Sequence, residues 1–243
     1  MITVLQALLA ALLGSQAADP EATPEAESPE TQGERVRVVE LFTSQACPMC
    51  PGANELLEDM GEADGGVLAL AYGVNYWDGF YDWTDPYAQE AFVARQEAYV
   101  AAGETRRVFT PHFVVNGAPE KLRYSEETVR EAVADAPGLD IPLSLSSDGE
   151  VITVQLGSMI RTSSAEIWAV AYEPGAEVMR IGGGPNEGRD MHHYNMVKGL
   201  ERVGQWSGDA LTLTLDDPGE ALATAVLVQD GPGGRILAAA RLD

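Results

Sequence analysis

The feature that most constrains this chain is a pair of cysteines, Cys47 and Cys50, placed where an apolar segment passes into a helix-forming one. Residues 35–43 form an apolar run that predicts a strand with buried faces, and residues 47–60 carry alanines, leucines and glutamates that favour a helix. Sulfur atoms at positions i and i+3 of a helix lie on one turn, close enough to form and break a disulfide. Because these are the only cysteines among 243 residues, a scaffold held by several disulfides is excluded.

The position of the cysteines at a helix start predicts a different role for each thiol. Backbone N–H groups and the helix dipole stabilise an anion at the first sulfur, so Cys47 is the expected nucleophile. Cys50, one turn later, is the expected resolving thiol, which attacks the mixed disulfide formed by the first. Zinc sites also use this spacing, but zinc prefers four ligands and the chain has no second pair of cysteines. The pattern therefore favours redox chemistry, with a metal site and a structural disulfide as the alternatives.

Hydrophobic patterning divides residues 35–243 into two regions with different expected secondary structure. Residues 35–137 alternate strand and helix patterns, which predicts an α/β domain with a mixed sheet flanked by helices. Residues 138–243 contain short apolar or alternating segments, which predict an all-β domain of sandwich type. The strands of this second domain are expected at residues 141–146, 151–156, 167–172, 210–215, 223–228 and 236–240, and residues 191–204 are expected to form a helix or loop.

The N-terminal segment is expected to lie outside the folded part. Residues 1–18 carry no charged side chain and are too short to span a bilayer, which needs about 20 apolar residues. Small residues predict cleavage of a signal peptide near Ala17 or Ala18, and hence a periplasmic or secreted protein; an ordinary N-terminal helix is the alternative. Residues 19–34 are acidic and rich in proline, which predicts a disordered linker.

The charge balance narrows the classes of partner. The chain has 38 acidic and 15 basic side chains, which gives a formal net charge of −23. A surface of this sign repels phosphate groups, so nucleic acid is not expected as a partner, and no membrane contact is expected beyond export. An apolar content of 45% still allows a proper core.

Thr110 and Pro111 lie just before an apolar strand and a hairpin turn at Asn116-Gly117. Proline is excluded from the interior of a central strand, so Pro111 is expected at the start of the strand, with either a trans or a cis peptide bond. A strand, a Cys-x-x-Cys pair at a helix start, and a later Thr-Pro before a hairpin and a last helix resemble the thioredoxin fold.

Longer sequence motifs resemble the domain-of-unknown-function 1223 (DUF1223) family, whose members are bacterial, mostly exported, thioredoxin-like proteins with an appended C-terminal region. The motifs that carry the resemblance are residues 39–51, 76–78, 95–96 with Tyr99, 110–117, 186–189 and 195–198. The resemblance implies that Cys47 and Cys50 are a redox pair and that Pro111 is a cis-proline facing them. It also implies that Thr110 offers its backbone to a substrate chain.

The chain departs from the family pattern at two positions. The family commonly carries a histidine at the position of Gly73 and an aspartate at that of Asn75. Any proton transfer that those side chains provide in relatives has to come from other groups in this chain.

Glu40 is a candidate for such a group. It shares one face of the first strand with Val38 and Phe42, and a carboxylate on a buried face is costly. A role as proton acceptor for Cys50 would explain its presence. The alternative is that Glu40 is solvated at a strand edge or paired with an arginine.

Aromatic residues between positions 72 and 87 are expected either to bind a substrate beside the cysteines or to anchor a long loop on the core. The expected substrate-binding side chains are Met49, Tyr76, Trp77 and His112. Cu(I) favours sulfur ligands, so Cys47, Cys50 and His112, with the thioether of Met49, also form a candidate copper set.

The sequence therefore predicts an exported thiol–disulfide oxidoreductase that acts on protein thiols or disulfides, or on a redox partner protein. Such a protein needs no cofactor beyond the Cys47–Cys50 disulfide. A copper-handling module that uses the same cysteines is the first alternative. A binding scaffold, in which the disulfide is only a staple, is the second.

Overall fold

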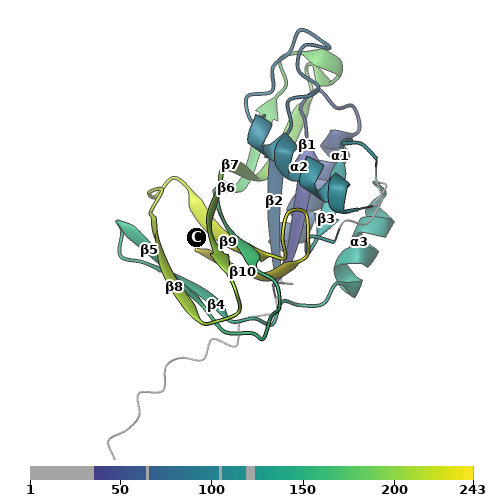
Figure 1. Ribbon diagram of the computed structural model, residues 1–243. Coiled ribbons are helices and arrows are strands. Elements are labelled where there is room, and N and C mark those ends of the chain that lie inside the picture. Colours follow the sequence, from purple (N-terminus) through teal and green to yellow (C-terminus); the bar gives the residue numbers. More distant parts are fainter. Residues whose placement is uncertain (1–35, 64–65, 104–105, 119–123, 243) are drawn as a thin grey trace, which may run out of the picture. The chain divides into compact units, whose positions relative to one another are not determined.

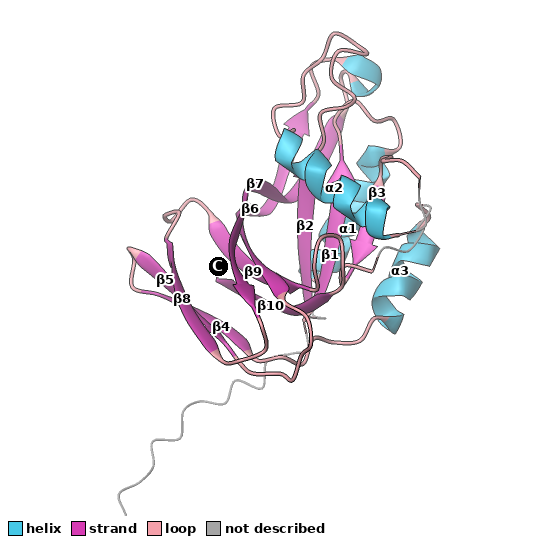
Figure 2. Ribbon diagram, viewed as in Figure 1, coloured by secondary structure: helices cyan, strands magenta, loops and turns pink. Residues whose placement is uncertain are grey.

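A seven-stranded mixed sheet carries most of the secondary structure, and a three-stranded sheet packs against part of it (Figures 1 and 2). The structure is a computed structural model and describes residues 36–63, 66–103, 106–118 and 124–242. The signal peptide expected at residues 1–18 and the linker expected at residues 19–34 lie outside the described residues. The protein has a mixed α/β fold with a large mixed sheet and few helices.

The elements are numbered in chain order. The helices are α1 (Cys50–Glu62), α2 (Glu90–Ala102), α3 (Glu126–Asp135) and a short 3-10 helix, η1 (Gly184–Asn186). The large sheet has the strand order β10-β9-β6-β7-β2-β1-β3 and contains β1 (Arg37–Thr43), β2 (Val67–Gly73), β3 (His112–Val115), β6 (Ala165–Arg180), β7 (Asp190–Trp206), β9 (Ala223–Gln229) and β10 (Ile236–Leu242). The small sheet has the order β4-β5-β8 and contains β4 (Leu143–Ser147), β5 (Val151–Leu156) and β8 (Leu211–Asp216).

Strand β1 is buried on both faces. It pairs in parallel with β2 and antiparallel with β3. Side chains of a strand alternate between the two faces of a sheet. Val39 and Leu41 therefore pack in one cluster with residues of α1 and α3, while Val38 and Phe42 pack in another with residues of α2 and β9.

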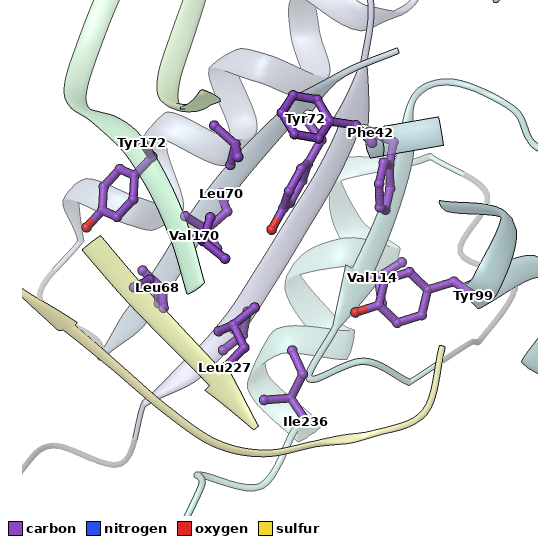
Figure 3. Close-up of a cluster of buried hydrophobic side chains, with 14 of the residues drawn as sticks. Phe42, Leu68, Leu70, Tyr72, Tyr99, Val114, Val170, Tyr172, Leu227 and Ile236 are labelled. Atoms are coloured by element: carbon purple, nitrogen blue, oxygen red, sulfur yellow. The ribbon is translucent and has the colours of Figure 1, made fainter. Parts of the chain in front are cut away.

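The core on the α2 face joins residues from both sides of position 137 (Figure 3). Tyr72 of β2 packs in one cluster with Leu227 of β9. Strand β7 pairs in parallel with β2, with Ala71 opposite Met196. The boundary expected after residue 137 therefore does not separate two sheets, because strands from both sides share one sheet and one core.

The small sheet covers the C-terminal part of the large one. Ile152 and Val154 of β5 pack in one cluster with Trp206 at the end of β7, Val226 of β9 and Ala238 of β10. Strand β5 pairs antiparallel with β4 on one side and with β8 on the other. The apolar residues of this second half thus form a core between two sheets.

Residues 191–204 form most of β7, so the prediction of a helix or loop there was wrong. Strand β7 pairs with β6 along nearly its whole length, from Asp190 opposite Arg180 to Trp206 opposite Ala165. The sequence of β7 has no sustained period of two, and the pairing contains register shifts. Hydrogen bonds to β6, rather than the pattern of β7 itself, decide its conformation.

Two elements begin later than predicted, for reasons of local backbone chemistry. Helix α1 begins at Cys50 rather than Cys47, and Pro51 lies in its first turn, where a missing N–H costs no helical hydrogen bond. Strand β3 begins at His112, directly after Pro111, because proline has no N–H to donate to a neighbouring strand.

A buried ion pair ties β1 to α2. The Glu40 side chain is 0% exposed, and its carboxylate accepts hydrogen bonds from Arg95 Nε at 2.6 Å and from the Tyr99 hydroxyl. Arg95 also donates to the Tyr99 hydroxyl at 3.0 Å and to Gln229 of β9 at 3.3 Å. The pair therefore fixes the position of α2 against strands from both halves of the chain.

Replacing Arg95 with methionine is expected to lower the free energy of unfolding by about 3–5 kcal/mol, because the Glu40 carboxylate would stay buried without its countercharge. Urea unfolding followed by circular dichroism measures the change. The double variant Glu40→Gln, Arg95→Met is expected to lose less, since no unpaired charge remains. A loss below about 1 kcal/mol for the single variant would contradict the buried pair, because that is the range of exposed pairs.

Candidate functional site

The turn between β1 and α1 holds both cysteines in buried positions. The Cys47 N–H donates to the Ser44 carbonyl at 3.1 Å, and the Cys50 N–H donates to the Cys47 carbonyl at 3.1 Å. Cys47 is 1% exposed, Cys50 is 0% exposed, and both side chains are free thiols. Both pack with Ile181 and Met191, which flank the tip of the β6–β7 hairpin.

The surroundings separate the acidities of the two thiols. The pKa of Cys47 is lowered from 9.0 to about 7, chiefly because the Cys50 thiol hydrogen-bonds to its sulfur; burial opposes this, and Thr110 adds to it. Burial, and next the neighbouring Cys47, raises the pKa of Cys50 well above its ordinary value. Cys47 is therefore the thiol that ionises near neutral pH, while Cys50 keeps its proton.

Thr110 and Trp77 border Cys47. The Thr110 side chain hydrogen-bonds to the Cys47 sulfur, and the Trp77 indole Nε1 donates to Thr110 Oγ1 at 2.7 Å. The Thr110–Pro111 peptide bond is cis, which is one of the two alternatives left by the sequence. The structure thus brings Cys47, Cys50, Thr110 and Trp77 together, with Pro111 next along the chain.

Asn186, in η1 at the tip of the β6–β7 hairpin, holds the cysteine turn from the other side. Its side chain is fully buried, and its Nδ2 donates to the carbonyls of Gln45 at 2.9 Å and of Cys47 at 2.8 Å. Residues 186–189 belong to a motif that resembles the family, but no local pattern in the sequence indicates that Asn186 contacts the cysteine turn. The two segments come together because β6 pairs with β7 and β7 pairs with β2, the strand beside β1.

Aromatic side chains cover the cysteines. Trp77 and Trp83 pack on the cluster that contains both cysteines. Gly182 and Gly183 make room for Trp83, because a Cβ added at either position would lie 2.9 or 2.7 Å from the indole ring. Gly182 and Gly183, which precede η1, therefore allow the Trp83 ring to pack over the cysteines.

Asp85 is a further residue that sequence reasoning missed. Its carboxylate accepts hydrogen bonds from the Gln45 N–H at 2.7 Å and from the Tyr87 N–H at 3.0 Å. The side chain is buried, which raises the pKa of Asp85. Asp85 fixes the start of the cysteine turn against the aromatic segment that follows β2.

Glu40 takes the second of the two roles expected from the sequence, a pair with an arginine, and His112 is buried. Among the described residues, the Glu40 carboxylate is engaged by Arg95 and Tyr99 rather than by Cys50. His112 is 2% exposed and hydrogen-bonded to Gln96 at 3.2 Å, and burial lowers its pKa to about 4. A substrate at the surface therefore does not reach the His112 imidazole.

The other expected substrate-binding side chains lie nearer the surface. Met49, between the cysteines, is 60% exposed, and Tyr76 is half-buried. Phe80 and Tyr81 are 75% and 46% exposed, and their rings lie 6.5 and 6.4 Å from the ring of Trp77. Exposed apolar side chains therefore flank the cover of the cysteines.

The described residues do not assemble the full copper set expected from the sequence. In the part of the chain that the structure describes, no three His, Cys, Asp or Glu side chains are grouped so that they could hold a metal ion. Cys47 and Cys50 are paired, but His112 is hydrogen-bonded to Gln96 instead of joining them. The candidate copper set is therefore reduced to the two thiols and the thioether of Met49.

Gly73 ends β2 at a close backbone contact. It forms a parallel bridge with Ala88, and an added Cβ would lie 2.7 Å from backbone atoms of Tyr87. A histidine at this position, as in the family pattern, would require the segment around Tyr87 to move.

The fold and site define a class, namely a mixed α/β protein whose dithiol lies at the start of a helix and packs against the tip of the β6–β7 hairpin. The chain belongs to the family described as protein of unknown function (DUF1223), whose sequence profile matches residues 38–229. The family membership expected from the sequence motifs is thereby confirmed. The comparison with curated proteins gives no match.

Among solved structures, the chain is similar to the crystal structure of protein AGR_C_4864 from Agrobacterium tumefaciens. The two share 29% sequence identity with a TM-score of 0.67, over 86% of this chain and 95% of the other. A β-glucosidase 3B from Thermotoga neapolitana gives 14% identity and a TM-score of 0.19, over 42% of this chain and 15% of the enzyme. That second likeness carries no argument.

Replacing Asn186 with alanine is expected to raise the pKa of Cys47, because the turn that directs hydrogen bonds at its sulfur loses two side-chain tethers. If the pKa rises by about one unit, the thiolate fraction at pH 7 falls about fivefold. The rate of iodoacetamide alkylation of Cys47 as a function of pH, followed by mass spectrometry, measures this shift.

The matched control for this experiment is Asn116→Ala. Asn116 accepts from the Val38 N–H at 2.8 Å and donates to the Pro137 carbonyl at 2.8 Å, so it also bridges two backbone groups. This control is expected to destabilise the fold without moving the alkylation profile. Identical profiles for Asn186→Ala and the wild type would exclude a role of Asn186 at the cysteine.

The free energy of unfolding is expected to fall as the pH drops from about 6.5 to about 4. The upper value is the ordinary pKa of histidine, and the lower value is the pKa of His112 and His193 in the folded protein. Burial lowers the pKa of His112 and of His193 to about 4, so the unfolded chain binds more protons in this window. Each histidine contributes a slope of about 1.4 kcal/mol per pH unit. Urea unfolding of His112→Gln across this range is expected to show one such contribution fewer, and an unchanged slope would contradict the buried neutral imidazole.

Proposed function

We propose that this protein is a thiol–disulfide oxidoreductase with a thioredoxin-like fold around β1, α1, β2 and β3. The observation that carries the proposal is the divergence of the two thiol acidities, with the pKa of Cys47 lowered to about 7 and that of Cys50 raised. A nucleophile that is ionised near neutral pH beside a protonated partner is the arrangement that thiol–disulfide exchange uses. The sandwich-like packing of the small sheet on β6, β9 and β10 supports a second, all-β part that carries the hairpin over the site.

The reaction begins at Cys47. Its thiolate attacks one sulfur of a substrate disulfide, so that a Cys47–substrate disulfide forms and the other substrate sulfur leaves as a thiolate. Cys50 then passes its proton to that thiolate and attacks the Cys47 sulfur. The second substrate sulfur leaves as a thiolate and takes up a proton from water. Two electrons have moved from the protein to the substrate, and the protein holds a Cys47–Cys50 disulfide.

The cover over the cysteines bears on which substrates react. Cys47 is 1% exposed, while attack requires a substrate sulfur in contact with its sulfur. The side chains of Trp77 and Trp83 therefore have to move before a protein disulfide reaches the site. Thr110 lies beside Cys47, and we expect its backbone to align the substrate chain.

The proposed setting is outside the cytoplasm of a bacterium, with export directed by residues 1–18. Protein thiols or disulfides, or a redox partner protein, are the proposed substrates, and no cofactor is needed beyond the disulfide. Extracytoplasmic compartments keep such pairs oxidised unless a reductant is delivered. Within the described ranges, no helix is long and apolar enough to cross a bilayer.

A second candidate function is Cu(I) binding by Cys47 and Cys50. The observation that favours it is that Met49, which is 60% exposed, stands in the chain between two cysteines of which one ionises easily. Cu(I) prefers such sulfur ligands.

The reduction potential of the Cys47–Cys50 pair separates an oxidoreductase from a protein in which the disulfide is structural. The protein without residues 1–18 is equilibrated with glutathione buffers, thiols are trapped by alkylation, and the mass shifts are counted. A potential between about −270 and −120 mV is expected, which is the span of working oxidoreductases. A value below about −300 mV would mean a structural disulfide and would overturn the proposal.

The copper alternative is tested on the same preparation. The reduced protein is incubated with Cu(I) and a competing chelator before alkylation. Oxidoreductase function predicts that Cys47 remains open to alkylation under these conditions. Protection of both thiols at one copper per protein, together with a potential outside the stated span, would favour the copper function instead.

A further inference from the structure

Two tryptophans pack over the cysteines, and their indole N–H groups differ in what they contact. Trp77 and Trp83 both pack on the cluster that contains Cys47 and Cys50. Trp77 Nε1 donates to Thr110 Oγ1 at 2.7 Å, which is at the short end of the range for such bonds. Trp83 Nε1 is buried without a partner among the described residues. Only the indole of Trp77 is therefore connected to a side chain that itself hydrogen-bonds to the Cys47 sulfur.

The hydrogen-bonding capacity of Thr110 limits what its hydroxyl group can do. A hydroxyl has one hydrogen and two lone pairs, whereas an indole N–H can only donate. The bond from Trp77 therefore occupies a lone pair of Thr110 Oγ1 and leaves the hydroxyl hydrogen for another acceptor. The Cys47 sulfur is such an acceptor. Because hydrogen bonds to an ionised group are stronger than those to a neutral one, this arrangement favours the thiolate of Cys47.

The Tyr76 hydroxyl also lies beside Thr110, but its own hydrogen is already used. Gln96 Nε2 donates to the Phe109 carbonyl at 2.7 Å and lies 3.2 Å from His112 Nδ1. The amide oxygen of Gln96 is thereby left to accept from the Tyr76 hydroxyl, at 3.3 Å. Towards Thr110, the Tyr76 oxygen can therefore only accept a hydrogen bond, and it does not replace Trp77 as the donor.

Covering a thiol and directing a donor at it have opposite effects on its ionisation. Burial raises the pKa of Cys47, whereas the hydrogen bonds to its sulfur lower it. If Trp77 only covered the thiol, loss of its contacts would lower this pKa. If Trp77 directs the Thr110 hydroxyl, loss of its N–H raises it. The two roles of Trp77 thus differ in the sign of their effect and can be separated by experiment.

We propose that Trp77 is a positioning residue for thiol–disulfide exchange, whose indole N–H holds Thr110 Oγ1 so that the hydroxyl hydrogen is directed at the Cys47 sulfur. The inference rests on the proposed function, since it concerns the nucleophile of that reaction. Trp77 acts on this nucleophile through Thr110 and takes no proton or electron itself.

The first test is Trp77→Phe, which removes the N–H and keeps an aromatic ring over the thiols. The pKa of Cys47 is expected to rise from about 7 to about 7.5, so that the thiolate fraction at pH 7 falls about twofold. The pH profile of iodoacetamide alkylation of the reduced full chain measures the midpoint. The ultraviolet absorbance of the thiolate measures the same midpoint without depending on access to the sulfur.

Trp83→Phe is the matched control. It removes an indole N–H from the same cover, but this N–H has no partner among the described residues. The midpoint of the Cys47 profile is therefore expected to stay where it is in the wild type.

Variants of Thr110 test whether Trp77 acts through this side chain. Thr110→Val removes the hydroxyl and is expected to raise the pKa of Cys47 to about 8, which lowers the thiolate fraction at pH 7 about fivefold. Adding Trp77→Phe to Thr110→Val is expected to give no further rise, because the indole has then lost its acceptor. Thr110→Ser keeps a hydroxyl and is expected to retain the wild-type midpoint.

A measurement on the unaltered cover needs no tryptophan variant. When Cys47 ionises, the Thr110 hydroxyl donates to a full charge, and its polarised oxygen accepts more strongly from Trp77. The indole N–H signal of Trp77 in ¹H–¹⁵N NMR spectra of the reduced protein is therefore expected to move with a midpoint near pH 7. In Cys47→Ser the signal is expected to stay in place over the same range.

Three results would each overturn the role of Trp77. These are a midpoint for Trp77→Phe at or below the wild-type value, an equal shift in Trp83→Phe, and a full further shift when Trp77→Phe is added to Thr110→Val. Melting curves of the variants check that each is folded.

Failure of the proposed function gives a different result. A reduction potential typical of a structural disulfide would overturn the exchange reaction, whatever the midpoint of Trp77→Phe. A potential typical of an oxidoreductase together with an unmoved midpoint would overturn only the role of Trp77.

Discussion

The pairing of β7 with β2 is the contact on which the rest of the structure depends. It places the long β6–β7 hairpin beside the strands that carry the cysteine turn, with Ala71 opposite Met196. From this junction the hairpin runs both ways. Towards one end, β6 pairs with β9 and completes the core under α2; towards the other, the tip carries η1 to the cysteines. Without the pairing of β7 with β2, the cysteines would lose their contacts with Ile181 and Met191 and the hydrogen bond from Asn186 to the Cys47 carbonyl.

The chemistry of the site follows from a competition between burial and hydrogen bonding. Burial alone would raise the pKa of both thiols. At Cys47 the hydrogen bonds from Cys50, Thr110 and the backbone exceed the effect of burial, whereas at Cys50 burial dominates. The same apolar cover that hides Cys47 therefore preserves the difference in acidity between the two thiols, and the backbone turn held by Asn186 keeps the donors directed at one sulfur.

Local features of the site could be read from the sequence, because they depend on neighbours in the chain. The spacing of Cys47 and Cys50 at a helix start, and a proline at the start of β3, are of this kind. The role of Glu40 required knowledge of what faces it, which is Arg95 on a helix 55 positions away. Asn186 and Asp85 also act through contacts between distant segments, so their contacts with the cysteine turn could not be predicted from a local sequence pattern.

The same distinction explains the fold. The strand predicted at residues 35–43 and the helix predicted at residues 47–60 match β1 and α1, apart from shifts at their ends, because both have clear local patterns. Strand β7 takes its conformation from its partner β6, and the shared sheet across residue 137 is a matter of pairing rather than composition. The change of hydrophobic pattern near residue 137 marks a change in secondary structure, but it does not mark the end of a hydrophobic core.

The tether from Asn186 to Cys47 has a consequence for newly made chains, since the two residues are 139 positions apart. Chains are synthesised at roughly 5–20 residues per second, so Asn186 is added roughly 7–30 s after Cys47. During this time the dithiol exists without the hairpin that covers it. Cys47, the thiol that ionises more easily, is therefore exposed during this interval, and its oxidation state depends on the redox conditions that a growing or translocating chain meets.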